Sequence, residues 1–171
     1  KIPTYTVLGF KNLSGEFVNR SAKYTKSSHY VTGFDYSIGN AAKISVEGFV
    51  KKYDNFPISL IDGVSLANKG ADFEVLGNEA VVTNGKGKTK GIEFLFQQKL
   101  TQNFYGIFSY TFFKSEFTDL NGNYLPSVWD SKHLSSFSGG YKLNRNWEIS
   151  SRWRFSGKTP YVPYDLEASL D

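Results

Sequence analysis

Hydrophobic and polar residues alternate with a period of two along most of this chain, and long stripes with helical spacing are missing. The alternation predicts β-strands, which we place at residues 30–38, 43–53, 91–100, 104–113, 133–143 and 147–155. The stretch GKTPYVPYD that follows contains two prolines and is expected to be a loop. The predicted fold class is therefore all-β, an antiparallel up-and-down meander.

The connections between these strands alternate in length. Residues 39–42, 101–103 and 144–146 are short turns, whereas 54–90 and 114–132 are long loops. The long loops would all lie at one end of the meander, which an ordinary soluble sheet has no reason to maintain. Outer-membrane barrels show this arrangement, with tight turns on the inner side of the membrane and long loops on the outer side. The pattern indicates a segment of a transmembrane β-barrel.

The two faces of the predicted strands differ in charge. One face carries no charged residue, and its members are Tyr30, Thr32, Phe34, Tyr36, Ile38, Ile44, Val46, Gly48, Val50, Ile92, Phe94, Phe96, Gln98, Leu100, Phe104, Gly106, Phe108, Tyr110, Phe112, Ser135, Phe137, Gly139, Tyr141, Leu143, Trp147, Ile149, Ser151, Trp153 and Phe155. A lipid-facing Lys or Arg near the bilayer midplane costs about 2–4 kcal/mol, so this face suits lipid. A soluble β-sandwich, in which each sheet has one face in water, would show the same alternation of hydrophobic and polar residues.

The opposite face carries charged residues on most of the predicted strands. Asp35, Glu47, Glu93, Arg152 and Arg154 are the polar side chains that we expect to line the lumen of a barrel. Glu47 and Glu93 are expected to join nearby lysines in a salt-linked wall. Aromatic residues beside the short turns have the placement of an interfacial girdle, which a sandwich does not explain.

Composition narrows the function classes further. The 171 residues include 15 Phe, 11 Tyr and 3 Trp, no Cys and no Met, with a net charge of +4. Thiol catalysis and thiolate metal sites are excluded, and no apolar run is long enough for a membrane-spanning helix. The mild, scattered basic excess makes nucleic acid an unfavoured partner. The start of the chain lacks the layout of a signal peptide.

Motifs for chemistry are weak. The run from Gly85 to Gly91 lacks the earlier glycine of a phosphate-binding loop and is interpreted as a flexible, cationic end of a loop. Asp119, Asn121, Asn123 and Asp130 have the spacing of calcium-loop ligands, but a plain turn on Asn121-Gly122 explains them better. We expect no catalytic residue, no metal site and no cofactor.

Residues 28–163 resemble the barrel of the TonB-dependent outer-membrane receptors. The similarity rests on HYVTGFDY, on ISVEGFVKKYDNFPISL, and on the whole stretch from GKGKTKGIEF to PYVP. Its most distinctive parts are Trp129-Asp130 with His133 at a strand start, and Gly157 with the PYVP that follows. Lys132 stands where the family usually has Arg.

The resemblance implies a function and partners. The family imports scarce nutrients through a 22-stranded barrel in the bacterial outer membrane, with a plug domain inside and energy from the TonB complex. It is not an enzyme family. This chain corresponds to about six strands of such a barrel, without plug, and its ligand is an iron chelate, a cobalamin, a glycan or a peptide. Outer-membrane lipid and a surface lipoprotein are further expected partners. Expected ligand contacts in the outer loops are Phe56, Asp62, Asp72, Phe73, Tyr124 and Trp129.

Three other classes stay open on the sequence. A complete eight-stranded outer-membrane barrel with an adhesion or structural role has about this length, although it should end in an aromatic strand. A soluble lipid-binding barrel of the lipocalin type fits the length but requires apolar inward faces. A carbohydrate-binding sandwich would use Trp129 and Tyr124 to stack on sugar.

Overall fold

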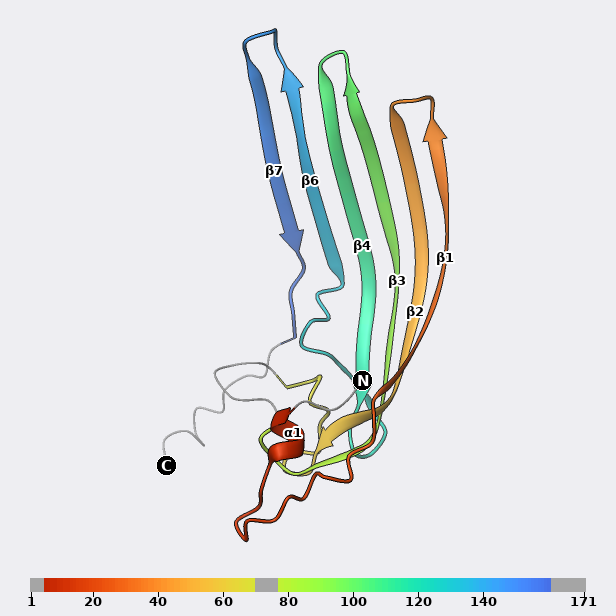
Figure 1. Ribbon diagram of the computed structural model, residues 1–171. Helices are drawn as coiled ribbons and strands as arrows, with labels where there is room; N and C mark the ends of the chain where they lie inside the picture. Colours follow the sequence, from red (N-terminus) through yellow and green to blue (C-terminus); the bar gives the residue numbers. More distant parts are fainter. Residues whose placement is uncertain (1–4, 70–76, 161–171) are drawn as a thin grey trace.

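The protein is one antiparallel sheet in a computed structural model that describes residues 5–69 and 77–160 (Figure 1). Its elements are α1 (Tyr5–Gly9), β1 (Lys26–Ile38), β2 (Ala42–Ser59), β3 (Val81–Thr101), β4 (Phe104–Thr118), β5 (Tyr124–Pro126), β6 (His133–Lys142) and β7 (Glu148–Ser156). The strand order is β1-β2-β3-β4-β6-β7, and the short β5 pairs with β4. The predicted all-β antiparallel meander is confirmed.

The two ends of the sheet differ. The three short turns, at 39–41, 102–103 and 143–147, lie together at one end, which we call the turn end (Figure 1, top). Helix α1 and the longer connections lie at the other end, the loop end. Within the described residues, β1 and β7 do not pair with each other, so the sheet is open. No helix in this part of the chain is long and apolar enough to cross a membrane.

The strands run farther toward the loop end than the alternation predicts. At the turn end every strand boundary lies within one residue of its prediction, but β2 continues to Ser59, β3 starts at Val81 and β4 continues to Thr118. The expected loops 54–90 and 114–132 are therefore too long. The interpretation of the run from Gly85 to Gly91 as a loop end is wrong, because the whole run pairs with β2 and its residues from Gly87 onward also pair with β4.

The register joins the uncharged positions of the strands into one surface. Directly paired residues share a face of a sheet. One cross-strand row reads Tyr36, Ile44, Phe96, Phe108, Phe137 and Trp153, with an uncharged residue on every strand. We call this surface the aromatic face. The opposite surface, which carries Asp35, Glu47, Glu93, Arg152 and Arg154, is the polar face.

Nothing in the described part of the chain covers the aromatic face. Phe34, Tyr36 and Ile149 are each more than 60% exposed. A soluble monomer rarely exposes an apolar surface that runs across a whole sheet, because burying such surface is favourable. The opposite face is charged, which a lipid-carrying barrel of the lipocalin type would not show. The geometry suits a wall with lipid on one side and water on the other.

A small apolar core lies at the loop end instead. Val7, Ile58, Ala67 and Phe117 are each at most 2% exposed. Strand β2 reaches this core through an irregularity at Asn55, where the register shifts and the backbone φ is 58°. Asn55 tolerates this left-handed conformation better than most residues do, and its amide donates to the Tyr24 carbonyl at 3.0 Å. The bulge turns the last residues of β2 toward the other loop-end segments.

Candidate functional site

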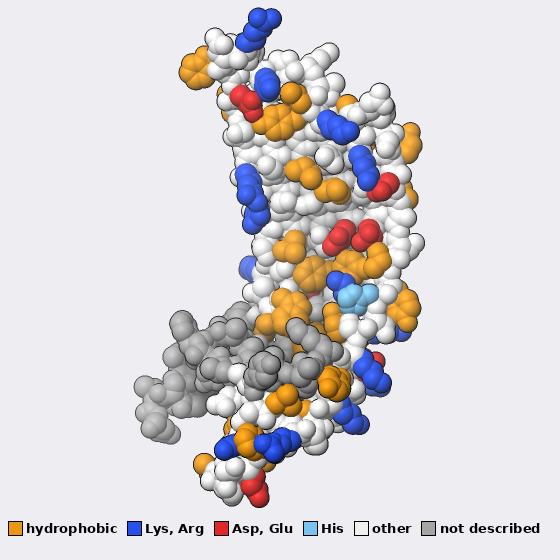
Figure 2. Space-filling model, viewed as in Figure 1, with side chains coloured by type: hydrophobic (Ala, Val, Ile, Leu, Met, Phe, Trp, Pro, Cys, Tyr) orange, Lys and Arg blue, Asp and Glu red, His pale blue; other side chains and the backbone are white. Residues whose placement is uncertain are grey.

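The five residues expected to line a lumen do share the polar face, shown in Figure 2 with charged side chains scattered over the strands. Asp35 forms an ion pair with Lys43 at 2.9 Å and accepts a hydrogen bond from the Ser45 hydroxyl at 2.5 Å. Arg152 and Arg154 are exposed on β7 and have no ion pair within the described residues. This face therefore carries charged side chains on several strands, with hydrophobic side chains between them (Figure 2).

Glu47 and Glu93 stand directly opposite each other on β2 and β3. The predicted ion pairs of these glutamates with nearby lysines are not formed, since neither glutamate has an ion pair among the described residues. The nearby Lys51 ammonium lies over the Phe49 ring instead, 5.1 Å from its centroid. Like charges directly opposite on neighbouring strands are unfavourable. The two carboxylates thus lie side by side without a cationic partner among the described residues.

Two of the expected ligand-contact residues meet at the loop end of the polar face. Phe56 packs against Phe117, with ring centroids 4.5 Å apart, and Trp129 packs edge-on against the same ring at 5.8 Å. The Trp129 indole donates to the Ser115 hydroxyl at 3.1 Å, and 46% of Trp129 is exposed. Phe117 anchors the cluster, and Trp129 offers an aromatic surface beside the polar face.

Tyr124 is not part of this cluster. It pairs with Thr118 and lies on the aromatic-face side of β4, where the Lys88 ammonium sits 3.8 Å from its ring centroid. The structure thus separates Tyr124 from Phe56 and Trp129. Asp72 and Phe73 lie outside the described residues.

Asp62 belongs to a polar network in the connection between β2 and β3. Lys69 forms ion pairs with Asp62 at 2.9 Å and with Glu79 at 2.7 Å, and the Ser59 hydroxyl is within hydrogen-bond distance of both carboxylates. Burial raises the pKa of Asp62, but hydrogen bonds from Lys69 and Ser59 outweigh it and hold the pKa below its usual range. The Asp62 carboxylate is already engaged within the fold.

The same network raises the pKa of Lys69. Burial opposes the ammonium charge, and the hydrogen bonds to Asp62 and Glu79, with their negative charges, more than compensate. The sequence pattern does not mark Lys69 and Glu79 as partners, because a lone charge in a long connection gives no periodic signal.

Asn19 holds three segments together, although no motif in the sequence marks it. It is 2% exposed. Its amide donates to the carbonyls of Val7 at 2.8 Å and Glu79 at 2.7 Å, and its side-chain oxygen accepts from the Val81 amide at 3.0 Å. These bonds satisfy buried backbone groups that would otherwise lack partners. Asn19 therefore fixes α1 against the start of β3.

The calcium-type spacing does not produce a shared site. The Asp119 carboxylate accepts from the backbone and side chain of Asn123 at 2.7 and 3.0 Å, which closes the turn at Gly122 (φ 85°). These bonds hold the pKa of Asp119 below its usual range. Asp130 is 1% exposed and accepts from the Ser115 amide at 2.8 Å. The described residues contain no group of three or more metal-ligating side chains.

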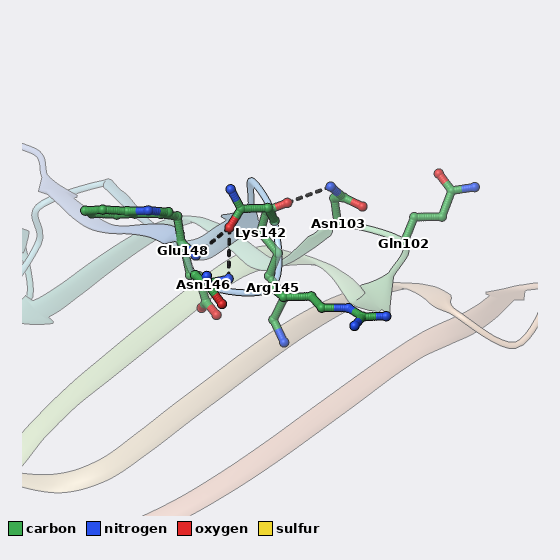
Figure 3. A pocket seen from close by; sticks show the side chains of 8 residues that line it. Gln102, Asn103, Lys142, Arg145, Asn146 and Glu148 are labelled. Atoms are coloured by element: carbon green, nitrogen blue, oxygen red, sulfur yellow. Dashed lines mark hydrogen bonds between the residues drawn. The ribbon is translucent and has the colours of Figure 1, made fainter.

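A polar hollow of about 630 Å³ lies at the turn end, between the turns at 102–103 and 143–147 (Figure 3). The Asn103 amide donates to the Lys142 carbonyl at 2.6 Å, and the Asn144 side chain accepts from the Asn146 amide at 2.8 Å. These amides are used to hold the turns. We therefore assign this hollow a structural role.

Comparisons with known proteins agree with this geometry. Residues 3–170 match the family model described as TonB dependent receptor-like, beta-barrel. No curated protein and no solved structure matches. The family model spans nearly the whole chain, including all the strands of the sheet. The chain belongs to the TonB-dependent receptor β-barrel family, whose members are receptors and transporters of the bacterial outer membrane.

Proposed function

We propose that this chain forms part of the wall of a receptor that imports a scarce nutrient with energy from the TonB complex. The observation that carries the proposal is the register, which from the turn end to the row of Thr32, Gly48, Ile92 and Phe112 gathers uncharged positions on one face and the charged positions on the other. The aromatic face contacts lipid, and the polar face borders the hydrated lumen. The loop end faces the outside of the cell.

The open edges support a larger barrel. A sheet edge in lipid leaves backbone groups without partners, which costs several kcal/mol per group. We therefore propose that β1 and β7 pair with strands outside the described residues. The lumen of such a barrel is wide enough to need a plug.

Glu47 and Glu93 form the proposed contact site for the plug domain. Two adjacent carboxylates without ion pairs in the described part of the chain favour a cationic group from a plug domain. Replacing both in the intact receptor, Glu47→Gln with Glu93→Gln, should loosen the plug, so that channels in a planar lipid bilayer open at a lower urea concentration. Glu16→Gln, the same chemical change in an exposed loop, is the control. If channels of the double variant open at the same urea concentration as those of the parent, the proposed contact between these glutamates and the plug is refuted.

The ligand is expected at the loop end. Trp129 presents an exposed ring, supported by Phe117, at the mouth of the proposed lumen. Asp72 and Phe73 stay predicted contacts, and a surface lipoprotein that covers this end is a further proposed partner. Asp62 and Tyr124 are engaged within the fold and are weaker candidates.

Growth assays test transport. Cells that depend on this receptor would receive iron chelates, cobalamin, oligosaccharides or peptides as the sole source of the nutrient. We expect one class to support growth only when both receptor and TonB are present, and Trp129→Ala to impair that growth more than the aromatic control Trp147→Ala. Equal growth without TonB would refute energy coupling.

A further inference from the structure

The aromatic face carries a group of lysines where its apolar part ends toward the loop end. The lysine ladder, as we call it, consists of Lys52 on β2, Lys88 and Lys90 on β3, and Lys114 on β4. The register pairs Lys52 with Lys88 and Lys90 with Lys114. Cations that stand directly opposite on neighbouring strands repel each other, so a nearby anion would stabilise the arrangement.

The protein supplies only part of that balance. Glu116 pairs with Lys114 at 2.8 Å and with Lys88 at 3.5 Å, and its side chain is 11% exposed. Lys52 and Lys90 are exposed and have no ion pair within the described residues. One row farther toward the loop end, Asp54 lies between Lys26 and Lys86. The ladder as a whole therefore keeps an excess of positive charge.

A depression of about 650 Å³ lies directly beside the ladder, on the side of the turn end. Lys90 and Lys114 stand at its rim, and its walls are mostly carbon, from Tyr30, Val50, Ile92 and Phe112. Its floor is open at Gly48, where the nearest heavy atom to an added Cβ would be 3.9 Å away. The depression thus exists because position 48 has no side chain.

Together, the two features have the chemistry of an anionic lipid. The apolar depression lies on the lipid-facing part of the wall, and the lysines stand where the polar headgroups begin. A free phosphate would use the lysines and leave the depression empty, whereas an acidic peptide has no reason to enter a lipid-facing groove.

We infer that this surface binds a phosphorylated, acylated lipid of the outer leaflet, with the phosphate on Lys90 and Lys114 and an acyl chain over Gly48. The site goes beyond the proposed import function. It depends on the outward orientation of the aromatic face and not on the plug, TonB or the nutrient.

The test uses the intact receptor in detergent micelles, with bound lipid counted by native mass spectrometry. The probes are bisphosphorylated lipid A, monophosphorylated lipid A and inorganic phosphate. We expect one tightly bound bisphosphorylated molecule, weaker binding of the monophosphorylated form, and no competition by millimolar phosphate. Competition by phosphate at that level would overturn the lipid assignment.

Two variants separate the charge from the groove. Lys90→Gln with Lys114→Gln should weaken lipid binding at least tenfold. Gly48→Leu should weaken it by a similar factor without any change of charge, because its side chain fills the depression. The control, Lys99→Gln with Lys142→Gln, removes the same charge elsewhere and should bind as the parent does.

Heat-modifiable electrophoretic mobility will show that each variant is folded. A folded double-lysine variant that binds like the parent would overturn the site. A folded Gly48→Leu variant with unchanged affinity would overturn the acyl-chain position.

Discussion

Phe94 and Leu95 are neighbours on β3 with opposite surroundings, so an arginine at each position measures the two faces separately. Phe94 pairs with Val46 and Tyr110 on the aromatic face, and Leu95 pairs with Ser45 and Ser109 on the polar face. Phe94 lies four residues from Lys90, or roughly 13 Å along the strand, which places it well inside the apolar region.

The magnitude follows from the surroundings. Arginine on the lipid face near the midplane costs about 2–4 kcal/mol. Phe94→Arg also loses the contact with Phe108, whose ring centroid is 6.2 Å away, worth about 0.5–1.5 kcal/mol. The sum is about 2.5–5.5 kcal/mol, whereas the side chain of Leu95→Arg reaches water and should cost much less.

The assay follows folding of the intact receptor into lipid vesicles against urea, with heat-modifiable mobility as the measure of the folded fraction. Phe94→Arg should lower the urea midpoint strongly, and Leu95→Arg only slightly. Equal losses, or a larger loss for Leu95→Arg, would refute the assignment of the faces.

Three further predictions concern the loop end and the connection after β7. Gly157→Ala should destabilise the folded receptor by about 1–3 kcal/mol, measured in the same urea assay, because its Cβ would lie 2.1 Å from a backbone carbonyl oxygen. Asn19→Ala should lower the local stability by about 1–3 kcal/mol, which would appear as faster hydrogen exchange at the start of β3. Unchanged exchange would contradict the role of Asn19 in fixing α1 against β3. The ion pair between Asp62 and Lys69 should contribute its full stabilisation between pH 3.8 and pH 10.5, which are the ordinary pKa values of the two groups. Its contribution is lost as the pH falls through the lowered pKa of Asp62 or rises through the raised pKa of Lys69, and a spin label at Ile61 should become more mobile at both extremes.

The sequence predicts the turn ends of the strands well for a physical reason. There the strands lie in the apolar region, where one face must be uncharged, so the period of two is strong from Phe104 to Phe112 and from Ile92 to Leu100. The same alternation predicts which positions share a face, and the register shows this grouping.

The loop ends could not be predicted in this way. From Thr83 to Lys90 both faces of β3 are polar or lack a side chain, so the pattern fades although the strand already begins at Val81. The glycines at 87 and 91 look like loop residues in the sequence. In the fold they make room for Phe117 and Phe49, because an added Cβ would come within 2.7 Å of either ring.

Tertiary contacts decide the roles of the remaining residues. The expected ligand contact Asp62 is engaged by Lys69, and Tyr124 lies under Lys88, because the chain brings distant segments together at the loop end. No local pattern marks such pairs. Phe56 and Trp129 lie far apart in the sequence, and only the fold shows that Phe117 joins them.

The central claim is that the aromatic face contacts lipid while the polar face borders water. The chain contains no Cys, so single cysteines at 92–99 can carry spin labels in an intact receptor that is free of other cysteines. Labels at even-numbered positions should be relaxed by dissolved oxygen, which concentrates in lipid, and labels at odd-numbered positions by a water-soluble nickel chelate. A uniform response along β3, or the opposite phase, would contradict the account.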